Sequence, residues 1–368
     1  MTTQHVATLI IGAGQAGLST GYHLQRRGHP FLIVDAADRV GDNWRRQWDS
    51  LRLYSPARYD GLPGLAFPAD DPWHFPGKDE VADYLEEYAL RFDLPVRMST
   101  RVDGLTAHEG GGFTATVGGD TVTCDNVVVA TGTFGRTPSV PAFAGDLDPG
   151  IRQLHSSEYR RPDGLPPGPV LVVGASHSGT DIAYEVAEHR DTILCGRDCG
   201  QIPVRLESWR GRRVLPVVFW MFRHVLTRRT PMGRRELPKV RHHGGPSLRV
   251  KREDLARRGV ERVTSRVVGV KDGRPLLEDG RVVDAATVIW CTGFQQRFDW
   301  IELPILGEDG WPVEHRGVAE ATPGLFFCGL SFQFAFSSML FMGVGRDADF
   351  VAARIAERAR RDASVAVA

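Results

Sequence analysis

The first glycine-rich turn of this chain has the residue types and spacing that bind a phosphate group. Its sequence, GAGQAG, places Gly12, Gly14 and Gly17 in a GxGxxG pattern. These glycines allow a tight turn, let a pyrophosphate approach the backbone, and pack a helix closely against a strand. Asp35 follows 18 residues after Gly17, where a carboxylate accepts hydrogen bonds from a ribose. The pattern therefore predicts a dinucleotide site.

A second turn repeats this pattern with one chemical change. GASHSG places Gly174, Ser176 and Gly179 at the same three positions, with serine in place of the middle glycine. The strand that follows ends in Arg197 rather than in an acid. A guanidinium forms paired, charge-assisted bonds to a 2′-phosphate, so this site favours NADPH. Asp198 stands beside it and leaves an NAD-type ribose contact as the alternative.

The elements around both turns fit a strand, turn, helix, strand order. Residues 7–11 are a continuous apolar run, typical of a central parallel strand, and residues 16–27 have helical spacing. Residues 31–35 form the next strand. The second turn has equivalent strands at 170–173 and 191–197. We therefore expect an α/β fold with two dinucleotide-binding, Rossmann-like units.

Two further apolar strands each end in Thr-Gly, within residues 126–138 and 286–298. Each follows its own glycine turn at a comparable distance, which favours a shared architecture. Between the first pair, residues 113–124 predict a hairpin, and residues 324–330 predict another buried strand.

Length and composition indicate a globular protein. The chain has 368 residues, 42% of them hydrophobic, which is enough for two or three domains with ordinary cores. We find no apolar run long enough to span a bilayer, and the first strand begins too close to Met1 for a leader. Five scattered cysteines suggest a reducing, cytoplasmic location, and no motif has the spacing of a metal site.

The charge is balanced overall but uneven along the chain. Residues 205–258 contain 16 Arg and Lys against 4 acids, a net charge of +12. This segment is either a solvated basic face or a surface that attracts phosphate or a membrane. It has no interleaving of aromatic and basic residues typical of nucleic-acid grooves, so we expect no nucleic-acid partner. Its apolar body, residues 214–226, is a lid, an interfacial helix or a buried helix; we favour the lid or the buried helix.

With these motifs in order, the chain resembles the flavin-containing monooxygenases, closest to the YUCCA-like branch and its bacterial relatives. The likeness covers roughly residues 6–355. It is carried by GAGQAG, VGDNW, ATG, HSSEY, GASHSG, CTGF and PGLFFCG. In that family the first turn holds FAD and the second holds NADPH.

The resemblance assigns binding residues to both cofactors. Those implied for FAD are Gly12, Gly14, Gly17, Asp35, Trp44, Gly132 and Gly329. Those implied for NADPH are Gly174, Ser176, Ser178, Gly179 and Arg197. It also implies an FAD domain formed by residues 1–160 and 285–368, with an NADPH domain at 161–284 inserted between its parts. The basic, apolar insertion lies near residues 201–250.

The implied chemistry is hydride transfer from NADPH to the flavin, formation of a 4a-hydroperoxyflavin, and transfer of one oxygen atom to a small organic substrate. The cofactor performs the difficult step, so few acids and bases are needed. We assign no catalytic residue; Tyr54 and His155 are the two candidates, and we expect His155 and His177 to support loops rather than act as general bases.

Two departures from the family pattern bear on the substrate. The segment PGIRQLHSSEY keeps His155 and Tyr159 of the FxGxxxHxxxY signature but has one extra residue before the histidine and lacks the phenylalanine. Tyr54 stands where many amine-oxidising members carry an asparagine near the flavin. The resemblance therefore does not favour amine N-oxygenation.

The segment SFQFAFSSMLFMG offers a further substrate clue. Phe332, Phe334 and Phe336 occupy alternate positions shortly after Gly329. They form either an aromatic surface for an apolar substrate or an ordinary core strand. The expected partners are this substrate and dioxygen; a peripheral membrane contact and a homodimer are left open.

The main alternative is an NADPH-dependent flavoprotein reductase that does not activate oxygen. Such enzymes use a redox dithiol beside the flavin. CGRDC places Cys195 and Cys199 within the predicted NADPH unit, at neither CxxC nor CxxxxC spacing, and Cys195 alternates with strand residues as a core thiol does. A non-enzymatic sensor that binds both cofactors is the second alternative.

Overall fold

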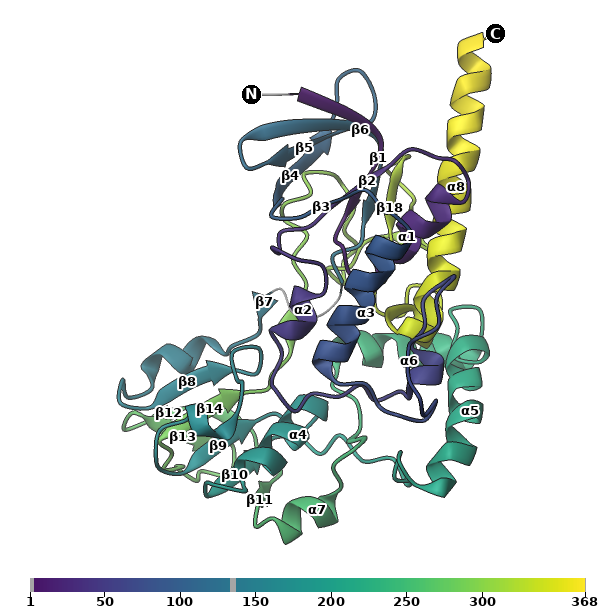
Figure 1. Ribbon diagram of the computed structural model, residues 1–368. Coiled ribbons are helices and arrows are strands. Elements are labelled where there is room, and N and C mark those ends of the chain that lie inside the picture. Colours follow the sequence, from purple (N-terminus) through teal and green to yellow (C-terminus); the bar gives the residue numbers. More distant parts are fainter. Residues whose placement is uncertain (1–2, 133–136, 368) are drawn as a thin grey trace.

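A computed structural model describes residues 3–132 and 137–367. It contains two large sheets, one with a parallel centre and antiparallel additions and one wholly parallel, and each carries one of the glycine turns, so the predicted α/β fold with two Rossmann-like units is confirmed (Figure 1). Apolar strands such as Val170–Val173 are buried on both faces, as parallel sheets require.

The first sheet has β1 near its centre and combines strands from both ends of the chain. Its parallel pairs are β3 with β2, β2 with β1, β1 with β6, and β6 with β18. Antiparallel β16 and β17 extend one edge, and the predicted hairpin appears as β5 and β6, with β4 beside them. The strands are β1 (Thr3–Ile11), β2 (Leu32–Val34), β3 (Val96–Arg97), β4 (Val102–Ala107), β5 (Phe113–Val117), β6 (Asp120–Val129), β16 (Glu314–His315), β17 (Val318–Ala319) and β18 (Leu325–Phe327).

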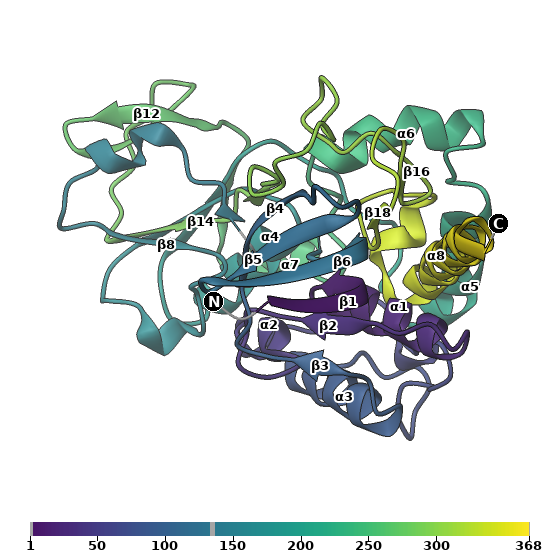
Figure 2. The same cartoon turned by 90° about the horizontal axis from the view of Figure 1, so that it is seen from above.

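Helices from both ends of the chain pack beside this sheet (Figure 2). Helix α1 contacts both α3 and the long C-terminal α8. The helices are α1 (Gln15–Gln25), α2 (Asp42–Arg45), α3 (Lys78–Arg91) and α8 (Phe341–Val367).

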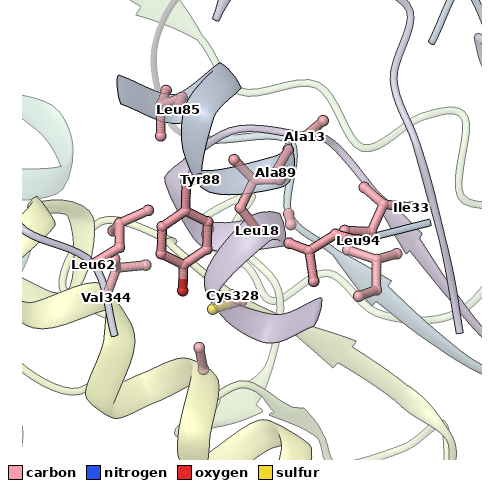
Figure 3. Packing of buried hydrophobic residues seen from close by; sticks show 14 of the residues in the cluster. Ala13, Leu18, Ile33, Leu62, Leu85, Tyr88, Ala89, Leu94, Cys328 and Val344 are labelled. Carbon is pink, nitrogen blue, oxygen red and sulfur yellow. The ribbon is translucent and has the colours of Figure 1, made fainter. Parts of the chain in front are cut away.

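The core between these helices and the sheet is aromatic at its centre. Tyr88 of α3 lies among Leu62, Val344 and Cys328 (Figure 3). Its hydroxyl donates to the carbonyl oxygen of Pro63 at 2.6 Å, which satisfies the one polar atom of the buried ring. The glycine turn of the first unit therefore rests on a packed core.

The second sheet is wholly parallel, in the order β11-β10-β9-β14-β8. Helices α4 and α7 pack with it, and a separate hairpin, β12 and β13, follows. The elements are β8 (Arg152–His155), β9 (Val170–Val173), α4 (His177–Val186), β10 (Thr192–Cys195), α7 (Arg252–Arg257), β11 (Glu261–Val263), β12 (Val267–Lys271), β13 (Arg274–Leu277) and β14 (Thr287–Trp290).

Two connections between the sheets run side by side as a small ribbon. β7 (Thr137–Pro138) pairs with β15 (Phe294–Gln295) in antiparallel fashion. The sequence-based boundaries at residues 160 and 285 differ from the sheet pairing, because β8 and β14 both lie in the second sheet. Sheet membership depends on long-range pairing, so the sequence interpretation left these two strands in the first unit. We propose unit boundaries near this ribbon instead.

The basic insertion forms α5 (Trp209–His224) and α6 (Pro231–His242). Both lie beside α8, away from the second sheet, in the two views (Figure 1, Figure 2). They pack on the short helix η4 (Phe336–Met339). Among the described residues, no helix combines the length and apolar character needed to cross a bilayer. The remaining short 3-10 helices are η1 (Ala57–Tyr59), η2 (Ala142–Asp146) and η3 (Pro162–Gly164).

Candidate functional site

The two glycine turns have nearly the same backbone arrangement. The amide of Gly12 donates to the carbonyl oxygen of Val34 at 2.8 Å, and that of Gly174 donates to Cys195 at 2.9 Å. Each glycine has positive φ, +114° and +108° respectively. In both units the turn therefore lies between the glycine-bearing strand and the next strand, at the carboxyl edge of the sheet, where open α/β folds bind nucleotides.

The third glycine of each turn is required by close packing. A methyl group on Gly17 would lie 1.8 Å from the Gly12 carbonyl oxygen, and one on Gly179 would lie 1.7 Å from that of Gly174. Both distances are far below van der Waals contact. The helices α1 and α4 can therefore approach their strands only with glycine at these places.

The middle position of the first turn is open. Apart from its neighbours along the chain, no described residue has an atom within 4 Å of a methyl group built on Gly14, the N-cap of α1. The N-terminus of α1, with the positive end of its helix dipole, lies at this open position. This cradle fits a pyrophosphate.

Asp35 stands beside that cradle. One carboxylate oxygen accepts from the amide of Ala13 at 2.7 Å, and the other accepts from Ala37 at 2.8 Å. A carboxylate oxygen has a further lone pair, so both can still accept a ribose hydroxyl. The structure therefore holds the predicted acid in one orientation at the edge of the first turn.

The equivalent edge of the second turn is basic. Arg197 is exposed just after β10. The neighbouring Asp198 accepts from the amide of Gly200 and from the guanidinium of Arg252, and both contacts lower its pKa. Arg205 instead forms paired 2.9 Å bonds with the carboxylate of Asp254. Asp198 is thus already engaged, while Arg197 projects from the strand end.

A chain segment covers the second turn. We call residues 243–247 the strap. The hydroxyl of Ser176 donates to the carbonyl oxygen of Gly245 at 2.9 Å, and a methyl group on Gly244 would lie 2.7 Å from the β-carbon of Ser176. The strap is anchored at its end, because the amide of Ser247 donates to Gly200. The first turn has open space at the matching position.

Tyr54 reaches from the first unit to α4 of the second. Its hydroxyl donates to one carboxylate oxygen of Asp181 at 3.0 Å, and Arg249 donates to the same oxygen at 2.9 Å. Its ring lies 5.1 Å from that of His177, centroid to centroid. Burial raises the pKa of Asp181, and Arg249 opposes that shift. Tyr54, Asp181 and Arg249 therefore form one partly buried link between the units, with Asp181 as its buried member.

Burial is the main cause of the pKa shifts of Tyr54 and of the neighbouring His177. Burial, and then Asp181, raises the pKa of Tyr54 well above its usual value. Burial lowers the pKa of His177. Tyr54 is thus a hydrogen-bond donor at neutral pH, and His177 is uncharged.

His155 lies at the end of β8 and is buried. Its Nε2 is 2.9 Å from the carbonyl oxygen of Gly293, and its Nδ1 is 2.8 Å from the hydroxyl of Ser157. The ring also contacts Phe294 edge-on at 4.9 Å between centroids. Both nitrogens are engaged, and burial lowers the pKa of the ring. In this structure His155 ties β8 to the segment after β14.

The other residues predicted for FAD are Trp44, Gly132 and Gly329. Trp44 of α2 packs against both the core beneath the first sheet and the core beneath the second, and its ring is 6.2 Å from that of Phe341. Gly132 and Gly329 both have positive φ, and a methyl group on Gly329 would lie 2.7 Å from the β-carbon of Ala16. The chain after β18 therefore passes close to the start of α1.

The three alternating phenylalanines do not form a strand, so the core-strand interpretation is wrong. Phe332 is buried with φ of +56°, and Phe336 begins η4. The ring of Phe336 lies 4.2 Å from that of Phe222 on α5. Phe334 instead faces three guanidinium groups. These belong to Arg229, Arg316 and Arg346.

An aromatic and apolar cluster fills the space between α5 and the first unit. Phe219 and Leu215 of α5 are buried in it together with Phe75, and Tyr54 and Tyr59 pack at its edge. The rings of Phe219 and Tyr59 are 4.7 Å apart. Phe222 extends this cluster to Phe336, so the insertion covers the region that follows Gly329.

Several residues at the second turn were missed in the sequence. Asp181 and its partner Arg249 are 68 positions apart in the sequence. Arg252, the partner of Asp198, lies at the start of α7, whereas Asp198 follows β10. Only the charge excess of residues 205–258 pointed to this region. Among the described residues, no group of three or more His, Cys, Asp and Glu side chains is arranged to hold a metal ion.

Comparisons with known proteins agree with this architecture. Residues 9–199 match the family described as pyridine nucleotide-disulphide oxidoreductase. An uncharacterised CzcO-like oxidoreductase of Geobacillus kaustophilus is 35% identical over 351 residues, which cover 95% of this chain and 98% of that protein.

One further relative and one solved structure are flavin monooxygenases by name. A probable indole-3-pyruvate monooxygenase of Arabidopsis thaliana, YUCCA7, is 26% identical, with 82% of this chain and 77% of that protein covered. The solved structure of a flavin-containing monooxygenase from Stenotrophomonas maltophilia superposes with a TM-score of 0.74 at 26% identity, covering 97% of this chain and 99% of that one.

Proposed function

Because the chain belongs to the pyridine nucleotide-disulphide oxidoreductase family, we propose that it is a flavin-dependent monooxygenase that consumes NADPH. The observation that carries this proposal is the pair of matched glycine turns, one beside an acid and one beside an arginine. Similarity to flavin monooxygenases over most of the chain supports the same activity. The finer proposal is transfer of one oxygen atom to a small apolar or aromatic substrate.

FAD is proposed to lie on the first turn. The open space above Gly14 and the fixed carboxylate of Asp35 suit its pyrophosphate and ribose. Trp44 touches both cores, which suits a position beside the reacting ring. The full proposed set is Gly12, Gly14, Gly17, Asp35, Trp44, Gly132 and Gly329.

NADPH is proposed to lie on the second turn, with Arg197 at its 2′-phosphate. Ser176 contributes its main-chain amide, because its hydroxyl is bonded to the strap. The full proposed set is Gly174, Ser176, Ser178, Gly179 and Arg197. The close approach of the two units at Tyr54 and Asp181 supports a transfer between the two cofactors.

Held by the residues of the first turn, FAD would supply the chemistry of hydride acceptance and dioxygen activation. The chain binds and orients both dinucleotides and excludes water from the site. The cluster that includes Phe75, Phe219 and Phe336 is suited to water exclusion and to an apolar substrate. Tyr54, held by Asp181, positions the junction between the units. We do not propose His155 as a base, since both its nitrogens are engaged.

The alternative of a dithiol reductase has less support. All five cysteines are free thiols, and burial raises the pKa of Cys195 to about 12. A thiol in this state is a poor nucleophile. Cys199 donates to the carbonyl oxygen of Arg197. Free thiols also suit a reducing compartment, so we keep a cytoplasmic location as part of the proposal; a homodimer stays a prediction.

Rapid mixing of the purified, flavin-loaded protein tests this function. NADPH should bleach the yellow flavin without air, and oxygen should then produce the spectrum of a 4a-hydroperoxyflavin before the yellow colour returns. Mass spectrometry should find an oxygenated product from at least one of amines, thioethers, ketones and indole-3-pyruvate. Free FAD with NADPH is the control. Direct reoxidation with no transient and no product would favour the reductase.

A further inference from the structure

We propose that helix α5 docks on an anionic lipid surface, with its axis in the plane of the membrane interface. The inference does not depend on the reaction that the enzyme performs. It rests on the two opposite faces of this helix, which differ in what they contact.

The inward face of α5 is already used. Leu215 and Phe219 are buried four residues apart, one helical turn along, and Gly211 lies in the same row. This face packs on the aromatic cluster that contains Phe75 and Tyr59. It holds the helix on the protein and is not available to a partner.

The outward face carries the apolar residues that the fold leaves unpacked. Trp209, Val217 and Trp220 are 63%, 65% and 58% exposed. With Arg213 and His224 they follow one another at spacings of three or four residues, so they share one side of the helix. The two tryptophans stand about 16 Å apart along the axis. In Figure 1 α5 forms an edge of the molecule.

The positive charge of α5 favours an anionic partner. Residues 209–224 contain four arginines and no acid. The guanidinium groups of Arg210 and Arg213 lie 5.4 and 5.2 Å from the centre of the Trp209 ring. Tryptophan side chains flanked by arginines are typical of helices that lie in a lipid interface, with the ring at the headgroup level and the charge toward lipid phosphates.

A second copy of this chain fits the same face poorly. Two-fold self-association would place the arginines of one α5 against those of the other, and like charges across an interface oppose binding. An anionic lipid surface meets the same face with opposite charge. We therefore commit to lipid as the occupant and leave self-association as an outcome of the test.

Flotation of the purified full chain with phospholipid vesicles tests the proposal. We expect binding to vesicles of mixed phosphatidylglycerol and phosphatidylcholine, weaker binding at high salt, and little binding to phosphatidylcholine alone. The double variant Trp209→Ser/Trp220→Ser should bind about ten-fold less. Arg210→Gln/Arg213→Gln should lose roughly five-fold for each arginine.

The matched control is Leu90→Ser/Leu306→Ser, which removes two exposed apolar side chains elsewhere and should bind as the wild type does. Circular dichroism and flavin content verify folding of each variant. Quenching of wild-type tryptophan emission by brominated lipids gives a reading that needs no variant.

Three results would overturn the proposal. The first is wild-type binding by the tryptophan variant. The second is no quenching and no flotation of the wild type with anionic vesicles. The third is a dimer in solution, detected by light scattering, that dissociates in the tryptophan variant while vesicles remain unbound.

Discussion

The two glycine turns share one backbone but differ in what surrounds them. In the first, the space above Gly14 is open, and the acid at the strand end bonds two amides. In the second, Ser176 is bonded to the strap, and the strand end is basic. The local motif therefore sets the shape of each turn and the charge at its strand end, while a segment distant in sequence sets the access to the second turn.

This difference suits two cofactors that behave differently. A flavin that stays bound needs a preformed cradle. A nicotinamide cofactor that binds and leaves at each turnover needs a site that opens. The strap and the Tyr54–Asp181–Arg249 link are present at the second turn. The following substitutions test whether the two turns are as alike in backbone, and as different in surroundings, as the structure indicates.

The largest effect is expected at the third glycine of each turn. Gly17→Ala and Gly179→Ala would each place a methyl group less than 2 Å from a backbone carbonyl oxygen of the same turn. Because the backbone must shift to relieve this overlap, each should lower the free energy of unfolding by roughly 4 kcal/mol or more. Thermal unfolding and soluble yield measure this.

Gly14→Ala is the control for this prediction. Its methyl group meets open space, so the variant should fold normally yet retain less flavin. Equal loss of stability in Gly14→Ala, or wild-type stability in Gly17→Ala, would contradict the geometry of the first turn.

The next effect is expected at the link beside the second turn. Asp181→Asn keeps the size of the side chain but removes the charge that faces Arg249, so the free energy of unfolding should fall by about 2–3 kcal/mol. Urea unfolding measures the change. Arg205→Gln breaks the more exposed pair with Asp254 and should lower the free energy of unfolding far less. Equal losses in unfolding free energy for the two variants would contradict the view that the link of Tyr54, Asp181 and Arg249 stabilises the protein more than an exposed ion pair does.

The third prediction concerns the charge at the second strand end. Arg197→Ala should raise the KM for NADPH roughly ten-fold to a hundred-fold with little change in kcat, because each lost bond to the 2′-phosphate is worth about 1.5–3 kcal/mol. Kinetics with NADH should barely change, since NADH lacks that phosphate.

Two arginines near this site serve as comparisons. Arg205→Ala should leave the NADPH preference intact, because Arg205 is held by Asp254. If Arg197→Ala also leaves that preference unchanged, Arg252, which bonds Asp198, becomes the next candidate. Equal losses with NADPH and NADH would instead assign Arg197 to the fold.

The smallest effect is expected at Ser176. Ser176→Ala removes a neutral hydrogen bond to the strap, worth about 1 kcal/mol, and should let NADPH bind up to roughly five-fold more tightly while flavin content stays the same. Fluorescence titration of the flavin-loaded protein measures the change. Weaker NADPH binding would mean that the hydroxyl contacts the phosphate directly and that the strap need not open.

Residues close in sequence were predicted well. Each glycine turn, its strand and its helix lie within about thirty residues, so spacing and periodicity predicted them. Asp35 was found for the same reason. The strap, the partner of Asp181 and the guanidinium beside Asp198 were not, because each comes from a segment about fifty to seventy residues away.

The same physical reason explains the corrections. Strand β14 resembles β6 in sequence, but its neighbour β9 is chosen by pairing across more than a hundred residues. Phe332, Phe334 and Phe336 alternate as in a strand, yet packing against α5 and three arginines turns them into a bend and a short helix. The sequence alone determined where the two glycine turns form and which strand end carries an acid or a base. Only the tertiary structure decided which turn is covered and which face of α5 stays exposed, because access and burial depend on contacts that local patterns do not encode.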